Sequence, residues 1–526
     1  MKRLTPLSCT ILTALALTPM VGSATQWAKT YHAGGAEVGY VLPISTSSDY
    51  YLLGQSTSET GDQNCLFGKL DPHGSVRWAK SIGGAKKDSL DVVPVSDGYL
   101  VHGTSQSFND GIDTKNKLVW AKFTKQWAQQ HAYRYGKSLQ EHGGTFAKTS
   151  DGGLLFYGSR TVPGANPNLN DQDILIIKIR PNGGIAWKKT LNYTLHDTLS
   201  SMVEVRDGYV FSGVVGDIIT SNGLLLMKLN KSGNIVFKNL YSIDIAKTFD
   251  RIGMGGNLLK LADGNLMLTG RIQQLNPLLG GDRTLAAKLS PGGALLWDTT
   301  YGSANLSQVA ALQIIENPAN KTLLFGGTIS HKAAIGTLPN SSLVALKTDK
   351  NGRILLQNAY GTSTEHNTGR LLGSVNALYF SGQHSTRVDD PDWKTLYGKL
   401  DATTLTPIWG RTFGGAGANL GILLRTPTEA APNFLVSGTT LDFGYSTAKK
   451  GDIFGLTPDV DGNYAGCTYL QPYTPLPGSP DLLETPIELQ TSTPDLQVLT
   501  PSSASSIILP VIDTSIATTD ICPSIP

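Results

Sequence analysis

The chain has 526 residues and a formal net charge of +2, with 43 basic and 41 acidic side chains. Proteins that bind nucleic acid usually have a clear excess of positive charge, and this chain has almost none, so no nucleic-acid partner is expected. Past its first residues, no stretch approaches the roughly 20 consecutive apolar residues of a spanning helix, so no membrane span is expected.

Residues 1–24 have the pattern of a secretory signal peptide. A short basic start with Lys2 and Arg3 precedes an apolar run over 11–17, and small residues end at Ala24. We therefore expect cleavage after Ala24 and a secreted, periplasmic or cell-surface protein. Cys9 lies ahead of most of the apolar run, which disfavours a lipid-anchoring cysteine.

Export would leave three cysteines, an odd number that allows one disulfide within the chain. The pair expected is Cys467 with Cys522, which would fasten the tail to the last repeat. Cys65 is expected to be a small apolar residue at the start of a strand.

The stretch over 65–84 recurs along most of the chain with a period near 55 residues, which indicates a repeat architecture. One lysine marks each copy, and an aromatic or large residue usually follows nine positions later, as Trp78 follows Lys69. The recurring lysines are Lys69, Lys122, Lys178, Lys228, Lys288, Lys347 and Lys399.

Each copy reads as four short strands. A glycine marks the second strand, and five copies have an Asp-containing turn, usually with Gly, before it. Asp-Gly between two β-type runs indicates an antiparallel hairpin. The marking glycines are Gly54, Gly103, Gly158, Gly213, Gly270, Gly327, Gly382 and Gly438. With no helical periodicity, this predicts an all-β, eight-bladed β-propeller of four-stranded antiparallel blades over residues 25–470. Seven blades plus an extra sheet is the alternative.

Residues 26–31 match the fourth strand of a copy but precede the first complete copy. We therefore predict that this N-terminal strand completes the last blade and closes the ring.

From residue 471 the repeat stops. Ten of the 27 prolines fall between Pro472 and Pro526, and six acidic residues occur there without any Lys or Arg. Residues 471–526 are expected to be a Pro/Ser/Thr-rich acidic tail, linker-like and partly disordered, with two apolar runs, 496–499 and 507–512, as candidate strands against the ring.

The motifs at 78–84, 97–103 and 66–78 resemble the repeats of secreted bacterial and archaeal propeller proteins of the delta-60 type. They are also similar, more weakly, to the tryptophan-docking repeats of quinoprotein dehydrogenases. That second resemblance implies an adjacent Cys-Cys pair over a quinone cofactor, and no two cysteines here are neighbours.

We interpret the recurring tryptophans as wedges that pack between blades. We expect the aliphatic part of each recurring lysine to lie on apolar surface and its ammonium group to be exposed to solvent. Asp residues also recur just before the third strand: Asp62, Asp113, Asp173, Asp282, Asp392 and Asp452. We interpret them as turn caps, with Ca²⁺ binding as the alternative. The sequence DVDGN around Asp459 mimics a Ca²⁺ loop but lacks the Glu at its twelfth position.

No catalytic motif or metal-ligand set stands out, so no catalytic or metal-binding residue and no cofactor is assigned. Long loops before the third strands share one predicted face and supply the candidate ligand-binding residues: Asp110, Asp113, Arg283, Asp389, Asp390 and Trp393. The expectation is a monomeric, non-catalytic scaffold that binds a protein or glycan. The alternative is an enzyme, either a glycan hydrolase or lyase or a quinone-dependent oxidoreductase.

Overall fold

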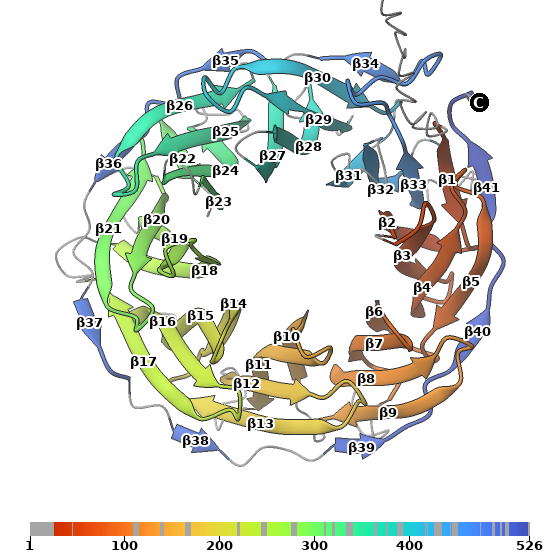
Figure 1. The fold of residues 1–526 in the computed structure, drawn as a ribbon, viewed down its shortest axis with the longest axis horizontal. Coiled ribbons are helices and arrows are strands. Elements are labelled where there is room, and N and C mark those ends of the chain that lie inside the picture. The colour runs from red at the N-terminus through yellow and green to blue at the C-terminus, as the bar shows by residue number, and fades with distance from the viewer. Residues whose placement is uncertain are drawn as a thin grey trace, which may run out of the picture.

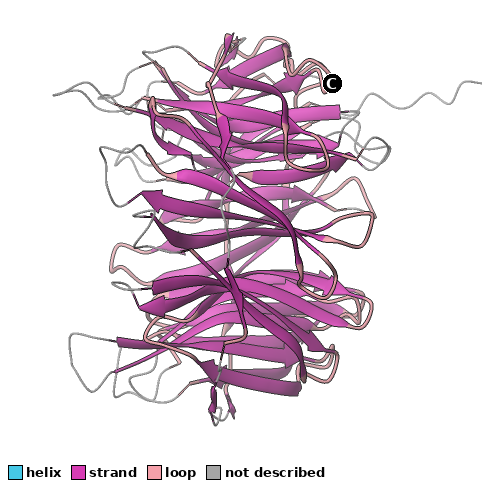
Figure 2. Cartoon of the chain, turned by 90° about the vertical axis from the view of Figure 1, so that its left-hand side faces the viewer, coloured by secondary structure: helices cyan, strands magenta, loops and turns pink. Residues whose placement is uncertain are grey.

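A computed structural model describes residues 26–523 except for 45, 109–114, 137–140, 164–169, 218–220, 244–249, 275–280, 310–311, 318–320, 333–339, 362–364, 375–376, 387–392, 416, 418, 426–433, 442, 444–450, 474, 486–489, 495–496 and 500–503. The described residues form strands and turns and no helix (Figure 2). None of them therefore builds a helix long and apolar enough to cross a membrane. The expected signal peptide lies outside the described residues.

The strands form a ring of blades, numbered here in chain order (Figure 1). Blade 1 contains β2 (Ala36–Pro43), β3 (Tyr50–Thr57), β4 (Gln63–Leu70) and β5 (Val76–Ile82). Blade 2 contains β6 (Asp88–Val95), β7 (Gly98–Ser105), β8 (Lys117–Thr124) and β9 (Gln129–Tyr135). Blade 3 contains β10 (Glu141–Lys148), β11 (Leu154–Pro163), β12 (Asn170–Ile179) and β13 (Ile185–Asn192). Blade 4 contains β14 (Thr198–Val205), β15 (Gly208–Asp217), β16 (Ser221–Asn230) and β17 (Ile235–Ser242).

Blade 5 contains β18 (Asp250–Lys260), β19 (Leu266–Gln274), β20 (Arg283–Leu289) and β21 (Leu295–Gly302). Blade 6 contains β22 (Leu306–Val309), β23 (Gln313–Asn317), β24 (Thr322–His331), β25 (Ser341–Thr348) and β26 (Ile354–Tyr360). Blade 7 contains β27 (His366–Ser374), β28 (Ala377–Ser385), β29 (Lys394–Leu400) and β30 (Pro407–Phe413). Blade 8 contains β31 (Asn419–Arg425), β32 (Leu435–Thr440), β33 (Asp452–Leu456) and, from the N-terminus, β1 (Ala28–His32).

The all-β propeller-type fold predicted from the repeat is confirmed, and so is its closure by the N-terminal strand. β1 pairs antiparallel with β33, so that Tyr31 lies opposite Ile453. Among the described strands, blades 6 and 7 share one sheet and every other blade has its own. The shared sheet is continuous through a single parallel bridge, Ser341 to His366, and dividing it there gives eight units around the ring.

Eight buried apolar clusters lie between neighbouring blades, and one of them joins blade 8 to blade 1 through Trp27, Tyr31, Leu52 and Leu66. The third strands explain this packing. In β12, Ile174 to Ile177 are all buried, because a strand covered on both faces needs apolar side chains on both. Burial of each blade against two neighbours therefore closes the ring.

The C-terminal segment corrects the expectation of a linker-like tail. Its described residues form eight short strands, which we call the belt, and each pairs antiparallel with the outermost strand of one blade. The belt strands are β34 (Leu470–Pro472), β35 (Pro477–Gly478), β36 (Leu483–Thr485), β37 (Gln490–Ser492), β38 (Gln497–Leu499), β39 (Ala504–Ser506), β40 (Val511–Asp513) and β41 (Ala517–Asp520). In chain order they pair with blades 7, 6, 5, 4, 3, 2, 1 and 8, so each blade gains one outer strand from the belt. In Figure 1 the belt runs around the outside of the ring.

A disulfide closes the belt. Cys467, just before β34, is bonded to Cys522, just after β41, which is the pair expected from the sequence. The acidic character of this segment also has a structural counterpart, because Lys29 pairs with Asp520 at 2.6 Å and Lys80 pairs with Asp513. The covalent loop thus encircles the ring, held by backbone pairing and by complementary charge.

The recurring lysine and the Asp of the preceding hairpin turn meet in each of five blades. The pairs are Lys69 with Asp49, Lys122 with Asp97, Lys178 with Asp151, Lys228 with Asp207 and Lys288 with Asp263. The interpretation of the recurring lysines as having solvent-exposed ammonium groups is wrong for Lys122 and Lys178, which are almost wholly buried. Each lysine therefore ties the third strand to the hairpin turn of its own blade.

Candidate functional site

One face of the ring carries the links from the fourth strand of each blade to the first strand of the next, and we call it the link face. Three positions from two blades meet at the described links. The first is the last residue of the fourth strand or the one after it, and the second is the residue opposite it at the start of the third strand. The third lies five or six positions after the first, at the start of the next blade. In blade 1 these are Gly83, Asn64 and Asp88. We call this set the link slot.

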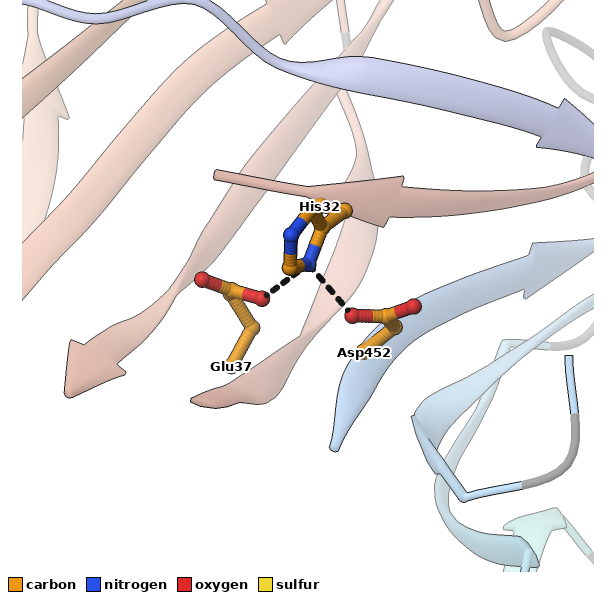
Figure 3. Close-up of side chains that lie close together, drawn as sticks. All are labelled: His32, Glu37 and Asp452. Carbon is orange, nitrogen blue, oxygen red and sulfur yellow. Dashed lines mark hydrogen bonds and ion pairs between the residues drawn. The ribbon is translucent and has the colours of Figure 1, made fainter. Parts of the chain in front are cut away.

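The link slot of blade 8 contains a histidine and two carboxylates (Figure 3). The ring nitrogen Nδ1 of His32 lies 2.8 Å from Oδ1 of Asp452 and 3.0 Å from Oε2 of Glu37. Neither carboxylate side chain has exposed surface, and 15% of the His32 side chain is exposed. The other oxygen of Glu37 accepts hydrogen bonds from the Gly35 N–H and the Ser56 hydroxyl, both at 2.8 Å. The strands that supply these residues come from the two ends of the propeller.

His32 is unusual for its position. The matching residue is glycine in five other blades: Gly83, Gly136, Gly302, Gly361 and Gly414. A Cβ at Gly361 would lie 2.6 Å from Nδ2 of Asn367, so the neighbouring side chain fills the slot there. In blade 8 the side chain of His32 fills it instead.

A second polar site lies in the link slot between blades 3 and 4, and we call it the Asp171 site. Arg160 donates two hydrogen bonds to Oδ2 of Asp173 within a buried ion pair. Nδ2 of Asn192 lies 2.8 Å from Oδ1 of Asp173 and 3.4 Å from both oxygens of Asp171. Asp197 accepts hydrogen bonds from the Tyr193 and Thr194 N–H groups and from the Thr194 hydroxyl. Asp171 and Asp173 therefore share the amide of Asn192, the guanidinium of Arg160 pairs with Asp173, and Asp197 binds the link between the two blades.

Two of these carboxyl groups have a raised pKa. Burial raises the pKa of Asp197 to about 6, and the charge of Asp171 adds to the rise although hydrogen bonds oppose it. Burial, followed by the charge of Asp173, also raises the pKa of Asp171, which is half-buried. The guanidinium of Arg160 pairs with the buried carboxylate of Asp173. The site thus places two carboxyl groups of raised pKa beside a carboxylate that is paired with arginine.

Two of the six candidate ligand-binding residues, Arg283 and Trp393, are among the described residues, and the structure does not bring these two together. Asp110, Asp113, Asp389 and Asp390 lie outside the described residues. Arg283 begins β20 in blade 5, whereas Trp393 precedes β29 in blade 7. The ring of Trp393 contacts His366 at 5.6 Å between centroids, and its carbonyl accepts the Asn419 N–H. Arg283 and Trp393 share the link face but belong to different blades.

The recurring Asp residues before the third strand are not all turn caps. Asp173 and Asp282 pair with Arg160 and Arg271 from the second strands, and Asp452 faces His32. Asp62 does accept a local hydrogen bond from Thr60. Asp113 and Asp392 lie outside the described residues. The cap interpretation is therefore wrong for three of the positions.

The Ca²⁺-like sequence near Asp459 is occupied by its own hydrogen bonds. Oδ1 of Asp459 accepts the N–H groups of Asp461 and Asn463, and Oδ1 of Asn463 accepts Arg411. This geometry is that of a capped turn.

Sequence reasoning missed both link-slot sites. An alignment of the copies held the signal for the first, because a histidine replaces a recurring glycine at position 32. For the second, Arg160 replaces Ser56 of blade 1 at the matching position of the second strand. Neither substitution indicates its partners without the fold.

A pocket of about 290 Å³ also exists on the described surface, lined by Asp263, Lys288, Glu316 and Lys321 among others. It lies beside the hairpin turns, away from the link slots, and it includes one of the recurring Lys–Asp pairs.

No family model matches the chain, and no curated relative matches it. Solved structures match in part. A lignostilbene dioxygenase of Pseudomonas brassicacearum is 11% identical, with 75% of this chain and 93% of that chain covered and a TM-score of 0.36. A variant of the apocarotenoid oxygenase of Synechocystis is 10% identical, with 72% and 91% covered and a TM-score of 0.32. A GH32 β-fructofuranosidase of Bombyx mori is 9% identical, with 82% and 91% covered and a TM-score of 0.27.

These similar structures are enzymes by name, which contradicts the expectation of a non-catalytic scaffold, and that expectation is withdrawn. At such TM-scores the similarities carry no argument about reaction or substrate. The case for an activity therefore rests on the Asp171 site alone.

Proposed function

We propose that the protein is an exported glycan-active enzyme, a hydrolase or lyase, in which Asp171 transfers the proton at the link face between blades 3 and 4. The observation that carries this proposal is the junction of Asp171, Asp173 and Asn192. A half-buried carboxylate that reaches solvent lies there beside a buried carboxylate fixed by an arginine.

Glycoside hydrolysis uses two carboxyl groups, one protonated and one ionised, on either side of the scissile bond. The raised pKa of Asp171 favours the protonated form of its carboxyl group, whereas Asp173 is paired with the guanidinium of Arg160. In a lyase, Asp171 in its ionised form would instead act as a general base and remove a proton from the substrate.

The spacing favours one stereochemical course. Nδ2 of Asn192 lies 3.4 Å from the oxygens of Asp171 and 2.8 Å from Oδ1 of Asp173, so these oxygens lie within about 6 Å of each other. Carboxyl groups about 5–5.5 Å apart are typical of retaining glycosidases, and inverting enzymes need roughly 6.5–9.5 Å. A hydrolase at this site is therefore expected to retain anomeric configuration.

The other residues have supporting roles in this proposal. Arg160 and Asn192 are positioning residues, because they orient the two carboxylates. Asp197 accepts hydrogen bonds from the backbone of 193–194, so it shapes the link between the two blades. His196, which is half-buried, lies close enough to favour the charged form of Asp171.

The test incubates the full-length exported chain with a panel of neutral and acidic polysaccharides. New reducing ends would report hydrolysis, and absorbance near that of an unsaturated uronate would report a lyase. Asp171→Asn is expected to lower the rate by about 100-fold or more, the range for loss of a general acid or base. Fractionation of the producing cells tests export.

The matched control is Asp62→Asn. Asp62 occupies the same position before the third strand of blade 1, since Gln63 and Gln172 make corresponding bridges one residue later. Its blade has Asn64 where blade 3 has Asp173, so no second carboxylate stands at that position. The variant should keep full activity. Equal rates in the parent chain and Asp171→Asn, or no product from any glycan, would contradict the proposal.

A further inference from the structure

We propose that the link slot formed by His32, Glu37 and Asp452 binds one divalent transition-metal ion that joins the two ends of the propeller. This inference does not depend on the activity proposed for the Asp171 site. It rests on the donor set, on the distances and on the place of the slot in the ring.

The donor atoms converge on one point. Nδ1 of His32, Oε2 of Glu37 and Oδ1 of Asp452 all lie within 4.8 Å of one another. A metal ion at ~2.1 Å from its ligands places neighbouring ligands roughly 3.0 Å apart in an octahedral site and roughly 3.4 Å apart in a tetrahedral one. The observed separations of 2.8 and 3.0 Å from Nδ1 fit the octahedral case with small adjustment. Figure 3 shows both carboxylates directed at the same ring nitrogen.

The charge of the slot favours a cation. Both carboxylate side chains are wholly buried, and both are directed at the same imidazole nitrogen. Buried carboxylates are usually paired or coordinate a metal ion. A divalent cation is therefore the kind of ligand that this slot would hold.

The ligand types decide the class of ion. Ca²⁺ and Mg²⁺ prefer sites made of oxygen atoms alone, whereas one imidazole nitrogen with two carboxylates suits Zn²⁺, Mn²⁺ or Fe²⁺. Glu37 is held in place through its other oxygen by Gly35 and Ser56, which is the kind of support that orients a metal ligand.

The position of the slot gives the ion a role. His32 ends β1 and Asp452 begins β33, the pair of strands that closes blade 8, while Glu37 lies in β2 of blade 1. His32 and Asp452 are 420 residues apart in sequence. An ion held by all three would therefore bind the closed ring and not the open chain, and it would stabilise closure by mass action.

The experiment uses the full exported chain, purified, stripped with chelator and dialysed. Metal content is measured after exposure to Zn²⁺ or Mn²⁺, and affinity is measured by calorimetry. Thermal unfolding is followed with and without each ion. One equivalent per chain is expected, with a rise in Tm of about 2 °C at 100-fold excess over Kd. Ca²⁺ at the same concentration should give a smaller shift.

The diagnostic variant is His32→Gly. Glycine occupies this position in five other blades, so it is compatible with the backbone conformation there. It should lower the affinity for Zn²⁺ or Mn²⁺ by at least about 100-fold and abolish the ion-dependent shift in Tm. Asp452→Asn should do the same, and His73→Ala, which removes an exposed histidine from a turn of blade 1, should change neither. No bound ion in the parent chain, or unchanged affinity in His32→Gly, would overturn the proposal and leave the three residues as a hydrogen-bonded clasp.

Discussion

The indole of Trp187 in blade 3 covers Gly233 in blade 4, and its Nε1–H donates to the carbonyl of Lys231 at 2.8 Å. A Cβ at Gly233 would lie 2.6 Å from Trp187 Cδ2. Trp27 with Gly74, Trp297 with Gly352 and Trp409 with Gly462 repeat the contact. The prediction that the recurring tryptophans wedge between blades is confirmed. In three of these four contacts the glycine that receives the indole lies five positions after a recurring lysine.

Gly233→Ala is expected to destabilise the protein more than Gly264→Ala does. Both glycines have a left-handed backbone, with φ of +82° and +84°, so alanine is strained at either position by roughly 1 kcal/mol. A Cβ at Gly264 meets no atom within 4 Å, whereas one at Gly233 displaces the indole, which adds about 1–3 kcal/mol. Urea unfolding of both variants measures the difference. Equal losses would mean that the indole contact contributes nothing beyond the backbone effect.

Cys467→Ser is expected to loosen the belt and lower the stability of the whole ring. The disulfide closes a loop with a sequence separation of 55, for which the chain-entropy model gives about 4 kcal/mol. Limited proteolysis should cut the belt of the variant at lower protease concentration, and its Tm should fall. Cys65→Ser is the control, because Cys65 is buried and unbonded. A variant Cys467→Ser as stable and as resistant as the parent would show that backbone pairing alone holds the belt.

Arg160→Leu is expected to be more damaging than Arg271→Leu. Both arginines pair with an Asp near the start of the third strand, but the side chains of Arg160 and Asp173 are 9% and 1% exposed, against 35% and 12% for Arg271 and Asp282. Removing Arg160 leaves Asp173 buried and unpaired from its cation, which costs about 3–5 kcal/mol, whereas water screens the second pair. Chemical denaturation compares the two, and similar losses would contradict this ranking.

Asp197→Asn is expected to change how stability depends on pH. Burial raises the pKa of Asp197 to about 6, so between about pH 4 and 6 the folded chain holds a proton that the unfolded chain releases. Stability from this group is therefore present at low pH and is lost as pH rises through about 6, by on the order of 2–3 kcal/mol. The amide retains an oxygen acceptor for the N–H groups of 193 and 194 and does not titrate.

The measurement is the difference in Tm between Asp197→Asn and the parent chain from pH 4 to 7. The variant should gain relative to the parent as pH rises, and the gain should level off above about pH 7. Other carboxylates contribute equally to both chains, so the difference in Tm removes their contribution. Asp151 is one of them: hydrogen bonds from Thr149 and Lys178 lower its pKa to about 2, against the effect of burial. A difference that stays constant across this range would refute the assignment.

The two link-slot sites were only partly accessible from sequence. Asp173 and Asp452 stood out because they recur before the third strand, but their partners did not. Arg160 lies 13 residues from Asp173, and His32 lies 420 residues from Asp452. A carboxylate in a repeat looks the same whether it caps a turn, pairs with arginine or faces a histidine, because the difference lies in the neighbour supplied by another strand.

The amino-acid sequence alone determined the all-β class, the antiparallel hairpins and the completion of the last blade by residues 26–31. These features follow from local turn residues and from side chains at fixed positions of the repeat, and both recur from copy to copy. The sequence indicated two strands of the belt, at 496–499 and 507–512, which overlap β38 and β40. The tertiary structure decided that the belt pairs with every blade, through strands as short as Pro477–Gly478. Such strands are held by backbone hydrogen bonds to the otherwise open edge of each blade, and backbone pairing needs no side-chain pattern that a sequence would display.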